Sequence, residues 1–465
     1  MSSGGHGGGG LPGLHFIEHM LHEAHFERGT HIYARPLIIA FSVAIVLFFF
    51  IAPYQSLHNF SVLLFLSPLW VPFILVKWAH AQFILTQKVA YNATQNHILL
   101  ELRLPRDTMK TVSAMESVIS AMHIGPGEAI WWKRSILGNT RPWYSLEIAS
   151  IGGRVHFYIW TRDVFRRAIE SALYAQYPGM ELIEVEDYSR LIDPAHEPNQ
   201  VTGFDYVKTQ PQPLPIRTYV EFGLDKPSKP EEQVDPLAQV IELLGSLGPK
   251  EQLWIQIIIR THKSEKYKGK FNKKGKPMSN WKDEAQDLIN DLRDEATPDN
   301  SYVDPVSGKT IKGKGFPNPT KGQMEKMAAI DRNVGKLAFD TGIRAIYTAP
   351  AEAYQGINGA FLVSLFKAFN SEDLNSLSVG PVWSNYIQGF PWEDPHGHHE
   401  AHAMHKMIDA YRRRAFFHPP YTGDWAVMST EELATLFHVP SATVATPSLP
   451  RIQSQTGGAP SNLPT

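Results

Sequence analysis

Five histidines within ten residues form the densest group of chemically versatile side chains in the sequence. His396, His398, His399, His402 and His405 lie in the stretch HGHHEAHAMH. On a helix, His398 and His402 share a face, as do His399, His402 and His405, and imidazoles at this spacing can bind zinc or nickel. The spacing from His399 to His402 is not that of the HExxH zinc motif, and a proline-rich loop precedes the cluster. We therefore favour a solvated helix and keep a metal site as the alternative.

The triplet Gly308-Lys309-Thr310 is the one resemblance to a phosphate-binding loop. Such a loop has a second glycine five residues earlier, after a strand, but this chain has Val303 there, in the polar stretch DPVSGKTIKGKG. The triplet is typical of a surface turn, so we expect no ATP hydrolysis by this chain alone. No Ser-His-Asp order, paired carboxylates or dinucleotide-binding glycine loop stands out. The sequence thus favours a protein that is not an enzyme and needs no cofactor.

A cluster of lysines is the third candidate for chemistry. The lysines lie between residues 263 and 276. The aromatic residues Tyr267, Phe271 and Trp281 lie among or beside them, and Glu265 adds a negative charge to the stretch. Lysines interleaved with aromatic rings suit contacts with nucleic-acid phosphates and bases, or with anionic lipid head groups. Solvated loop charge is the simpler interpretation. The candidate contact residues are Lys263, Lys266, Lys268, Lys270, Lys273, Lys274 and Lys276.

Two apolar runs near the N-terminus precede all of these candidate residues in the chain. Pro36 to Pro53 and Phe60 to Trp78 contain no charged residue before Lys77. Each is about as long as a helix that crosses the roughly 30 Å hydrocarbon core of a bilayer. The runs predict two transmembrane helices, with Tyr54 to Asn59 as a tight turn between them.

The orientation of this predicted hairpin follows from its charges. Arg28 and Arg35 precede the first run, Lys77 and Lys88 flank the end of the second, and the turn has neither lysine nor arginine. Positive residues favour the cytoplasmic side. We therefore expect a two-pass protein of the inner (plasma) membrane with both termini in the cytoplasm. The chain has no cysteine, which is compatible with a reducing compartment.

The rest of the chain predicts an α+β fold. Strands are expected at Ile98–Leu104, Tyr144–Ser150, Arg154–Trp160 and Met180–Glu186, with helices at Thr108–His123 and Thr161–Gln176. The order strand, helix, strand, strand, helix, strand is that of a ferredoxin-like (split βαβ) domain.

A second unit of the same kind is expected after the proline-rich joint at 210–215. Its elements are a strand at Ile216–Phe222, a helix from Asp235 to about Leu247, a strand at Gln252–Arg260, a helix at Thr320–Phe339, a strand at Ile343–Pro350 and a helix from Ala351 to Phe369. Residues 262–319 form a polar insertion without an apolar face, which predicts a protruding or mobile arm.

These elements predict five parts of the chain. They are a flexible glycine-rich leader with a candidate interfacial helix (1–35), a transmembrane hairpin (36–90), a first ferredoxin-like domain (98–190), a second one (211–375) and an irregular C-terminal helix and loop region with an extended tail (376–465). In the last part, Ser429 and Glu432 form a capping-box pattern that predicts a short helix over Ser429–Phe437.

Two stretches of this body resemble the region that precedes the motor in membrane-anchored ATPases of conjugation and type IV secretion. One is SLEIAS (145–150), followed by GRVHFY (153–158) and AQYP (175–178). The other is ELATLFHVP (432–440), followed by Thr446-Pro447 and Asn462-Leu463-Pro464. The P-loop motor that follows this region in the family is absent from the sequence.

The resemblance implies a membrane-anchored, non-catalytic scaffold or adaptor of a DNA or protein transfer assembly. Its expected partners are the lipid bilayer, a separate P-loop ATPase, further copies of itself and, through the lysine cluster, nucleic acid. The alternatives are a metal-dependent membrane-tethered enzyme built on the histidine cluster and a stand-alone membrane-bound nucleic-acid-binding protein.

Overall fold

The computed structural model describes most of the chain in two compact units. The described residues are 53–105, 110–125, 130–191, 199–226, 234–267, 269–272, 275–298, 302–303, 310–311, 315–380, 398–418, 421–440 and 451–452. Of the described residues, one unit, here called the body, contains Asn92–Trp131 and those from Thr140 onward; the other contains Pro53–Tyr91 and Trp132–Asn139. The leader, nearly all of the first apolar run, His396 and most of the tail lie outside the described residues.

Two helices occupy the place of the predicted hairpin turn. Helix α3 (Pro53–Phe65) covers the whole stretch from Tyr54 to Asn59, and helix α4 (Ser67–Ala93) follows after one residue. The predicted tight turn is therefore wrong. The stretch YQSLHN has no glycine or proline that would end a helix, whereas Pro53 and Pro68 each lie in the first turn of a helix, where a missing N–H costs nothing.

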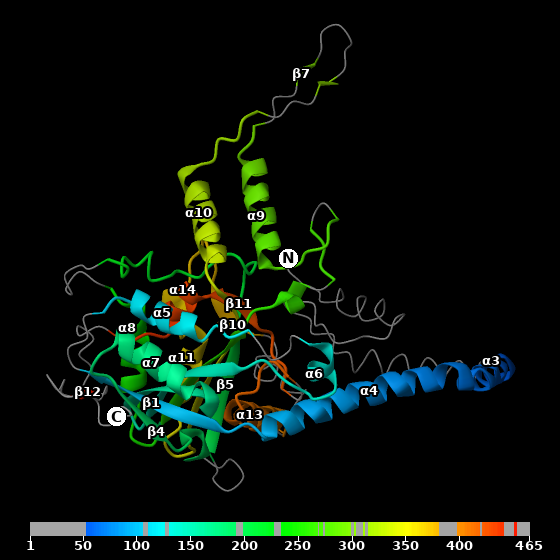
Figure 1. The fold of residues 1–465 in the computed structure, drawn as a ribbon, viewed down its shortest axis with the longest axis horizontal. Coiled ribbons are helices and arrows are strands. Elements are labelled where there is room, and N and C mark those ends of the chain that lie inside the picture. Colours follow the sequence, from blue (N-terminus) through cyan, green and yellow to red (C-terminus); the bar gives the residue numbers. More distant parts are fainter. Residues whose placement is uncertain are drawn as a thin grey trace. The chain divides into compact units, whose positions relative to one another are not determined.

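A large, mostly antiparallel sheet forms the centre of the body, which confirms the α+β class (Figure 1). Among the described residues the strand order is β10-β5-β9-β6-β2-β3-β1-β12, with β4 paired to β1 and β11 to β9. Only the β1–β12 pair is parallel. The strands are β1 (His97–Pro105), β2 (Trp143–Ile151), β3 (Arg154–Arg162), β4 (Glu181–Val185), β5 (Asn199–Lys208), β6 (Gln252–Thr261), β9 (Ala338–Pro350), β10 (Leu377–Val379), β11 (Ala426–Ser429) and β12 (Arg451–Ile452).

The sheet contains the same strand order twice. The first half runs β4-β1-β3-β2 and the second runs β10-β5-β9-β6, so the fourth strand of each half pairs with the first and the third lies between the first and second. Every pair within the two halves is antiparallel. The halves join where β2 pairs antiparallel with β6, placing Ile148 opposite Ile255.

Helices cover one face of this sheet and form the main core. Alternate side chains of the strands, such as Leu146 and Ile257, point to this face and are completely buried. The covering helices are α5 (Ser113–Ala121), α7 (Arg166–Gln176), α8 (Pro236–Gly245), α11 (Gly356–Ser364) and α14 (Thr430–Leu436). Asp235 caps α8 through its side chain, with Pro236 in the first turn as the sequence predicted.

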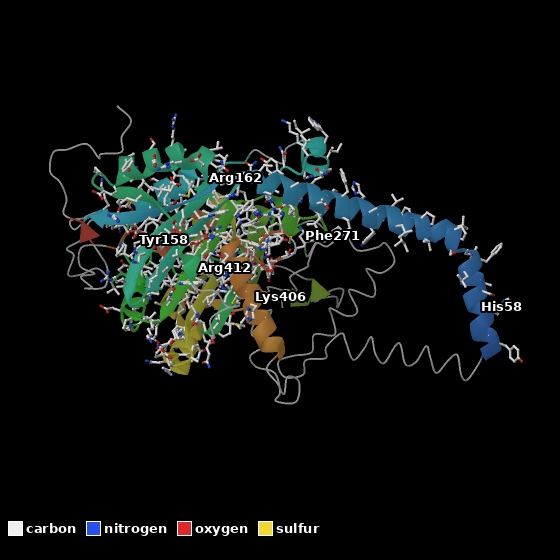
Figure 2. The ribbon with its side chains drawn as sticks, turned by 90° about the horizontal axis from the view of Figure 1, so that it is seen from below. His58, Tyr158, Arg162, Phe271, Lys406 and Arg412 are labelled. Atoms are coloured by element: carbon white, nitrogen blue, oxygen red, sulfur yellow. The ribbon has the colours of Figure 1, made fainter. Side chains whose placement is uncertain are left out.

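Helix α13 (His398–Arg412) covers part of the opposite face (Figure 2). Its Met407 and Tyr411 pack with Trp254 in a second apolar cluster on the sheet. The chain after α13 stays close to the same face: a side chain at Gly342 of β9 would collide with the ring of Phe416. A residue without a Cβ is required at that crossing.

The second half begins with a strand that the sequence pattern did not reveal. Its first strand is β5, whereas the segment predicted as a strand, Ile216–Phe222, consists of turns; that prediction is wrong. Prolines at 211, 213 and 215 precede the segment, and side chains of α14 bind its backbone. The Ile216 N–H donates to Glu432 Oε1 at 3.0 Å and the Tyr219 N–H to Thr435 Oγ1 at 3.0 Å. No strand partner is therefore needed for these groups.

The insertion between β6 and β9 contains an ordered helix pair. Helix α9 (Trp281–Glu295) lies beside α10 (Lys321–Gly335), and Ile289 of α9 packs with Ile330 of α10 (Figure 1). The prediction that residues 262–319 lack an apolar face is wrong for α9. Strands β7 (Tyr302–Val303) and β8 (Thr310–Ile311) pair beyond it. The remaining short elements are α6 (Trp131–Ser135) and the 3-10 turns Asp163–Phe165, Tyr188–Leu191, Ser264–Tyr267 and Lys367–Phe369.

Candidate functional site

A row of polar residues crosses the sheet on the face that α13 covers. Strand register places one such residue of each of six neighbouring strands at the same level. Each residue of the row except Glu101 is at most 5 % exposed. Buried polar groups on a sheet are costly unless each finds a partner. The row consists of Asp205, Arg344, Gln256, Glu147, Tyr158 and Glu101.

Glu147, in the middle of this row, is completely buried and accepts hydrogen bonds from several directions. Ser145 Oγ donates to its Oε1 at 2.6 Å and Gln256 Nε2 at 3.2 Å. Tyr188 donates its hydroxyl to Oε2 at 2.9 Å. Both carboxylate oxygens thus accept hydrogen bonds from polar side chains before any charge is considered.

Arg414 supplies the positive charge that matches Glu147. Its Nε lies 3.0 Å from Glu147 Oε1 and its Nη2 lies 3.1 Å from Oε2, a two-pronged ion pair. Asp187 also accepts from Arg414 Nη1. Burial alone would lower the pKa of Arg414, but the charges of Glu147 and Asp187 raise it well above the ordinary value. The guanidinium therefore stays charged inside the protein.

The backbone of Arg414 is also unusual. Its φ of 48° is the only positive φ of a non-glycine residue within the described part of the chain. A left-handed conformation costs an ordinary residue roughly 1–2 kcal/mol. Arg414 adopts it just past the end of α13, the position where helices usually place glycine. The ion pair with Glu147 offsets this cost and attaches the end of α13 to the sheet.

A second charged cluster lies where β6 leads into the insertion. Arg260 Nε donates to Asp340 Oδ2 at 2.9 Å, and His262 Nδ1 lies 2.6 Å from Asp340 Oδ1. Arg141 adds an ion pair to Glu265, which also accepts from Arg260. Burial alone would raise the pKa of Asp340, but the His262 hydrogen bond and the arginine charges hold it below the ordinary value.

The lysine cluster is partly engaged in intramolecular contacts. Lys266 donates to the Trp425 carbonyl and lies 3.4 Å from Asp424 Oδ1, and burial lowers its pKa. Lys270 lies over the ring of Tyr267, Lys263 is half-buried and Lys276 is exposed. Lys268, Lys273 and Lys274 lie outside the described residues. A role of the cluster in binding nucleic acid or lipid stays a prediction.

Four histidines of the cluster, from His398 to His405, lie on α13, in line with the predicted helix, and His396 is outside the described residues. His405 is exposed, while the side chains of His398, His399 and His402 are outside the described set. No metal-binding group of three or more histidine, cysteine or acidic residues occurs where side chains are described. Of the GKT triplet, Thr310 begins β8, paired with β7 in a small two-stranded sheet.

The stretch 432–440 is structural. Ser429 and Glu432 form the predicted capping box, and every residue of α14 is buried. Glu432 also lies 2.7 Å from the ammonium of Lys208, whose side chain is completely buried. Burial lowers the pKa of Lys208 even though Glu432 opposes this shift. Nothing in the sequence around Lys208 or Arg414 marks them as interior residues, because their partners lie far away along the chain.

Within the described part of the chain, no apolar neighbour covers the most apolar segment of helix α4. Leu69 is 77 % exposed and Val76 is 67 % exposed, and no part of its most apolar segment is buried. Among the described helices, α4 alone is long and apolar enough to cross a membrane. Soluble proteins rarely expose such a surface without a partner for it.

Together these features define a mixed α+β body with paired internal charges, in a chain that also has an exposed apolar helix. Residues 84–451 match the family described as a domain of unknown function (DUF8128), and the chain belongs to this family. No curated protein matches the chain.

Proposed function

We propose that this chain is a membrane-anchored, non-catalytic scaffold of a type IV secretion-like DNA or protein transfer assembly. The observation that carries the proposal is the uncovered apolar surface of α4, which suits lipid as its surroundings. Inner-membrane location with a cytoplasmic body accords with Lys88 near the body-side end of α4. The resemblance of 145–158 and 432–440 to the pre-motor region of transfer ATPases suggests the kind of assembly.

The strand order supports tandem ferredoxin-like domains as the finer description of the body. Apart from the insertion between β6 and β9, the main elements of each half have the chain order strand, helix, strand, strand, helix, strand and the spatial order 4-1-3-2. Such domains bind other proteins through helix faces and sheet edges. Ile357, Phe361 and Val363 of α11 are exposed apolar side chains that a partner could cover.

Membrane retention provides the first test. After lysis without detergent, we expect full-length protein in the membrane pellet, resistant to alkaline carbonate wash and released by mild detergent. A Val76→Arg, Leu75→Arg double variant should be released by the carbonate wash more readily than the wild type, since arginine within a span costs about 2.5–3.5 kcal/mol. Wild-type protein in the supernatant would refute the anchor.

Co-purification tests the scaffold role. After detergent extraction we expect a P-loop ATPase or further copies of the chain to be recovered, and recovery to fall for Phe361→Glu. Lys367→Glu, on the following 3-10 turn, is the control for added negative charge. Wild-type protein that is recovered alone and as a monomer would refute the scaffold, even if the anchor is correct.

A further inference from the structure

The loop Trp132–Asn139, which includes most of α6, belongs to the same compact unit as α4, although 38 residues separate it from Ala93 at the end of α4. Gly138 approaches the backbone of α4 closely, with a φ of 68°. A Cβ at Gly138 would lie 2.6 Å from the Lys88 backbone nitrogen and would overlap the backbone of Gln87. The loop therefore packs directly on the backbone of α4, near its C-terminal end (Figure 1).

The internal bonding of this loop makes it a compact platform. The Ile136 N–H donates to the Trp132 carbonyl at 2.8 Å, and the Asn139 N–H donates to the Lys133 carbonyl at 3.0 Å. The second bond spans six residues and closes around Gly138 in the left-handed conformation, which is the usual end of a helical turn. Ser135 is buried beneath the turn.

The outer surface of the platform combines apolar and basic side chains. Trp132, Ile136 and Leu137 are each 46–47 % exposed, although they are large and apolar. Lys133 and Arg134, between them, are exposed as well. A tryptophan beside aliphatic and basic residues is the composition that proteins place at the membrane–water interface.

The neighbouring part of α4 continues the same surface chemistry. Phe83 and Val89 are exposed on α4 beyond Trp78, where the predicted apolar run ends. The apolar residues Phe83, Ile84 and Leu85 extend the apolar character of α4 past Trp78. Gln87 lies only about 3 Å along the helix axis from Leu85. With lipid around α4 as far as Leu85, the platform attached at Gln87 and Lys88 lies at the level of the head groups, which extend roughly 5–7 Å beyond the core.

We propose that residues 132–138 form a second membrane contact, in which Trp132, Ile136 and Leu137 enter the interface and Lys133 and Arg134 bind the head groups of anionic lipids. This inference rests on the proposed membrane anchoring by α4. The contact fixes how the end of α4 meets the lipid surface, because the platform is packed rigidly on the helix backbone.

The absence of cysteine from the chain permits a direct test by single-cysteine labelling. Full-length Ile136→Cys carries an environment-sensitive fluorophore in liposomes with or without phosphatidylglycerol and with nitroxide lipids as depth quenchers. Leu75→Cys, in α4, reports on the anchor itself, and Ser117→Cys, exposed on α5, is the water-exposed reference. We expect a blue shift and quenching by shallow nitroxides at position 136, both stronger with the anionic lipid.

Three further variants test the cause of this signal. Lys133→Gln and Arg134→Gln should each weaken docking about fivefold, as expected for a basic residue at an anionic surface, and Lys110→Gln should not. Gly138→Ala should reduce the signal at position 136 without changing that at Leu75→Cys. If position 75 is quenched but position 136 behaves like position 117, the platform inference is wrong and the anchor stands. If position 75 is not quenched, the anchor itself is wrong.

Discussion

At the residue scale, the interior of the body is notable for charges that are buried in pairs. Glu147 with Arg414 and Lys208 with Glu432 join segments that are far apart in sequence. An ion pair of this kind adds little net stability compared with apolar residues of the same size, but removing one member leaves an unpaired buried charge. These pairs therefore constrain which segments pack together more than they stabilise the fold.

Substituting alanine for Glu147 or for Arg414 should show this asymmetry. We expect Glu147→Ala and Arg414→Ala each to lower the free energy of unfolding by about 3–5 kcal/mol, because each leaves a buried charge without its partner. The double variant should lose clearly less than the sum of the two. Chemical denaturation of full-length protein in detergent measures all three.

Arg413 offers a matched control for the alanine variants of Glu147 and Arg414. It pairs with Asp409, but their side chains are 65 % and 40 % exposed. Arg413→Ala should change stability by no more than about 1 kcal/mol, as for other solvent-exposed ion pairs. Additive losses for Glu147→Ala and Arg414→Ala would contradict the coupling described above.

The half-buried His97 and the buried His438 predict opposite responses to pH. Burial and the charge of Arg162 lower the pKa of His97 to about 4, whereas Asp235, opposing the effect of burial, raises that of His438. The folded state thus resists protonation of His97, so stability is lost as pH falls from about 6.5 toward 4. The contribution of His438 has the opposite sign: it is present below about 6.5 and is lost as pH rises through its higher folded pKa.

Melting temperatures at pH 7 and pH 5 separate these effects, because few carboxylates titrate in that range. His97→Asn should reduce the loss of stability between pH 7 and pH 5, and His438→Gln should increase it. The exposed His405 is the control, since His405→Asn should leave the difference unchanged. The same pH response in all three variants would show that neither His97 nor His438 contributes as described.

At the element scale, local patterns succeeded where local interactions decide the structure. Strands β2, β3 and β6 follow their alternating or apolar runs, and the capping box of α14 follows from Ser429 and Glu432. The alternation at Ile216–Phe222 failed because a strand also needs a free edge to pair with, and side chains of α14 already bind that backbone.

Helix α9 provides a test of order within the insertion. Asn280 caps it, accepting from the backbone N–H groups of Lys282 at 2.9 Å and Asp283 at 3.2 Å. Asn280→Ala should destabilise α9 locally by about 1 kcal/mol. Faster amide hydrogen exchange in α9, with unchanged exchange in β6 and β9, is the expected result.

Gln286→Ala is the control for this prediction, because the side chain is exposed in mid-helix and alanine is a good helix former. It should leave exchange in α9 unchanged or slower. Equally fast exchange throughout α9 in the wild-type protein and in Asn280→Ala would mean that the helix is not stably formed.

At the scale of the whole molecule, two similar halves share one continuous sheet. They meet where β2 pairs with β6, and this junction turns the polar positions of separate strands into a single row. Because Glu147 lies opposite Gln256 at the junction, the Arg414 contact acts at the centre of the sheet rather than at an edge. Helix α13 thereby covers residues from both halves.

Features that depend on neighbours along the chain could be predicted without a structure: the α+β class, most strands and helices, the caps of α8 and α14, and the apolar character of α4. Periodicity, capping and hydropathy are local properties, so they can be read before folding. The folded structure was needed to show that β5 begins the second half, that Arg414 lies buried against Glu147, and that Gly138 contacts α4. Those outcomes depend on strand register and on segments distant in sequence, because the partner that neutralises a charge or fills a space is chosen by packing.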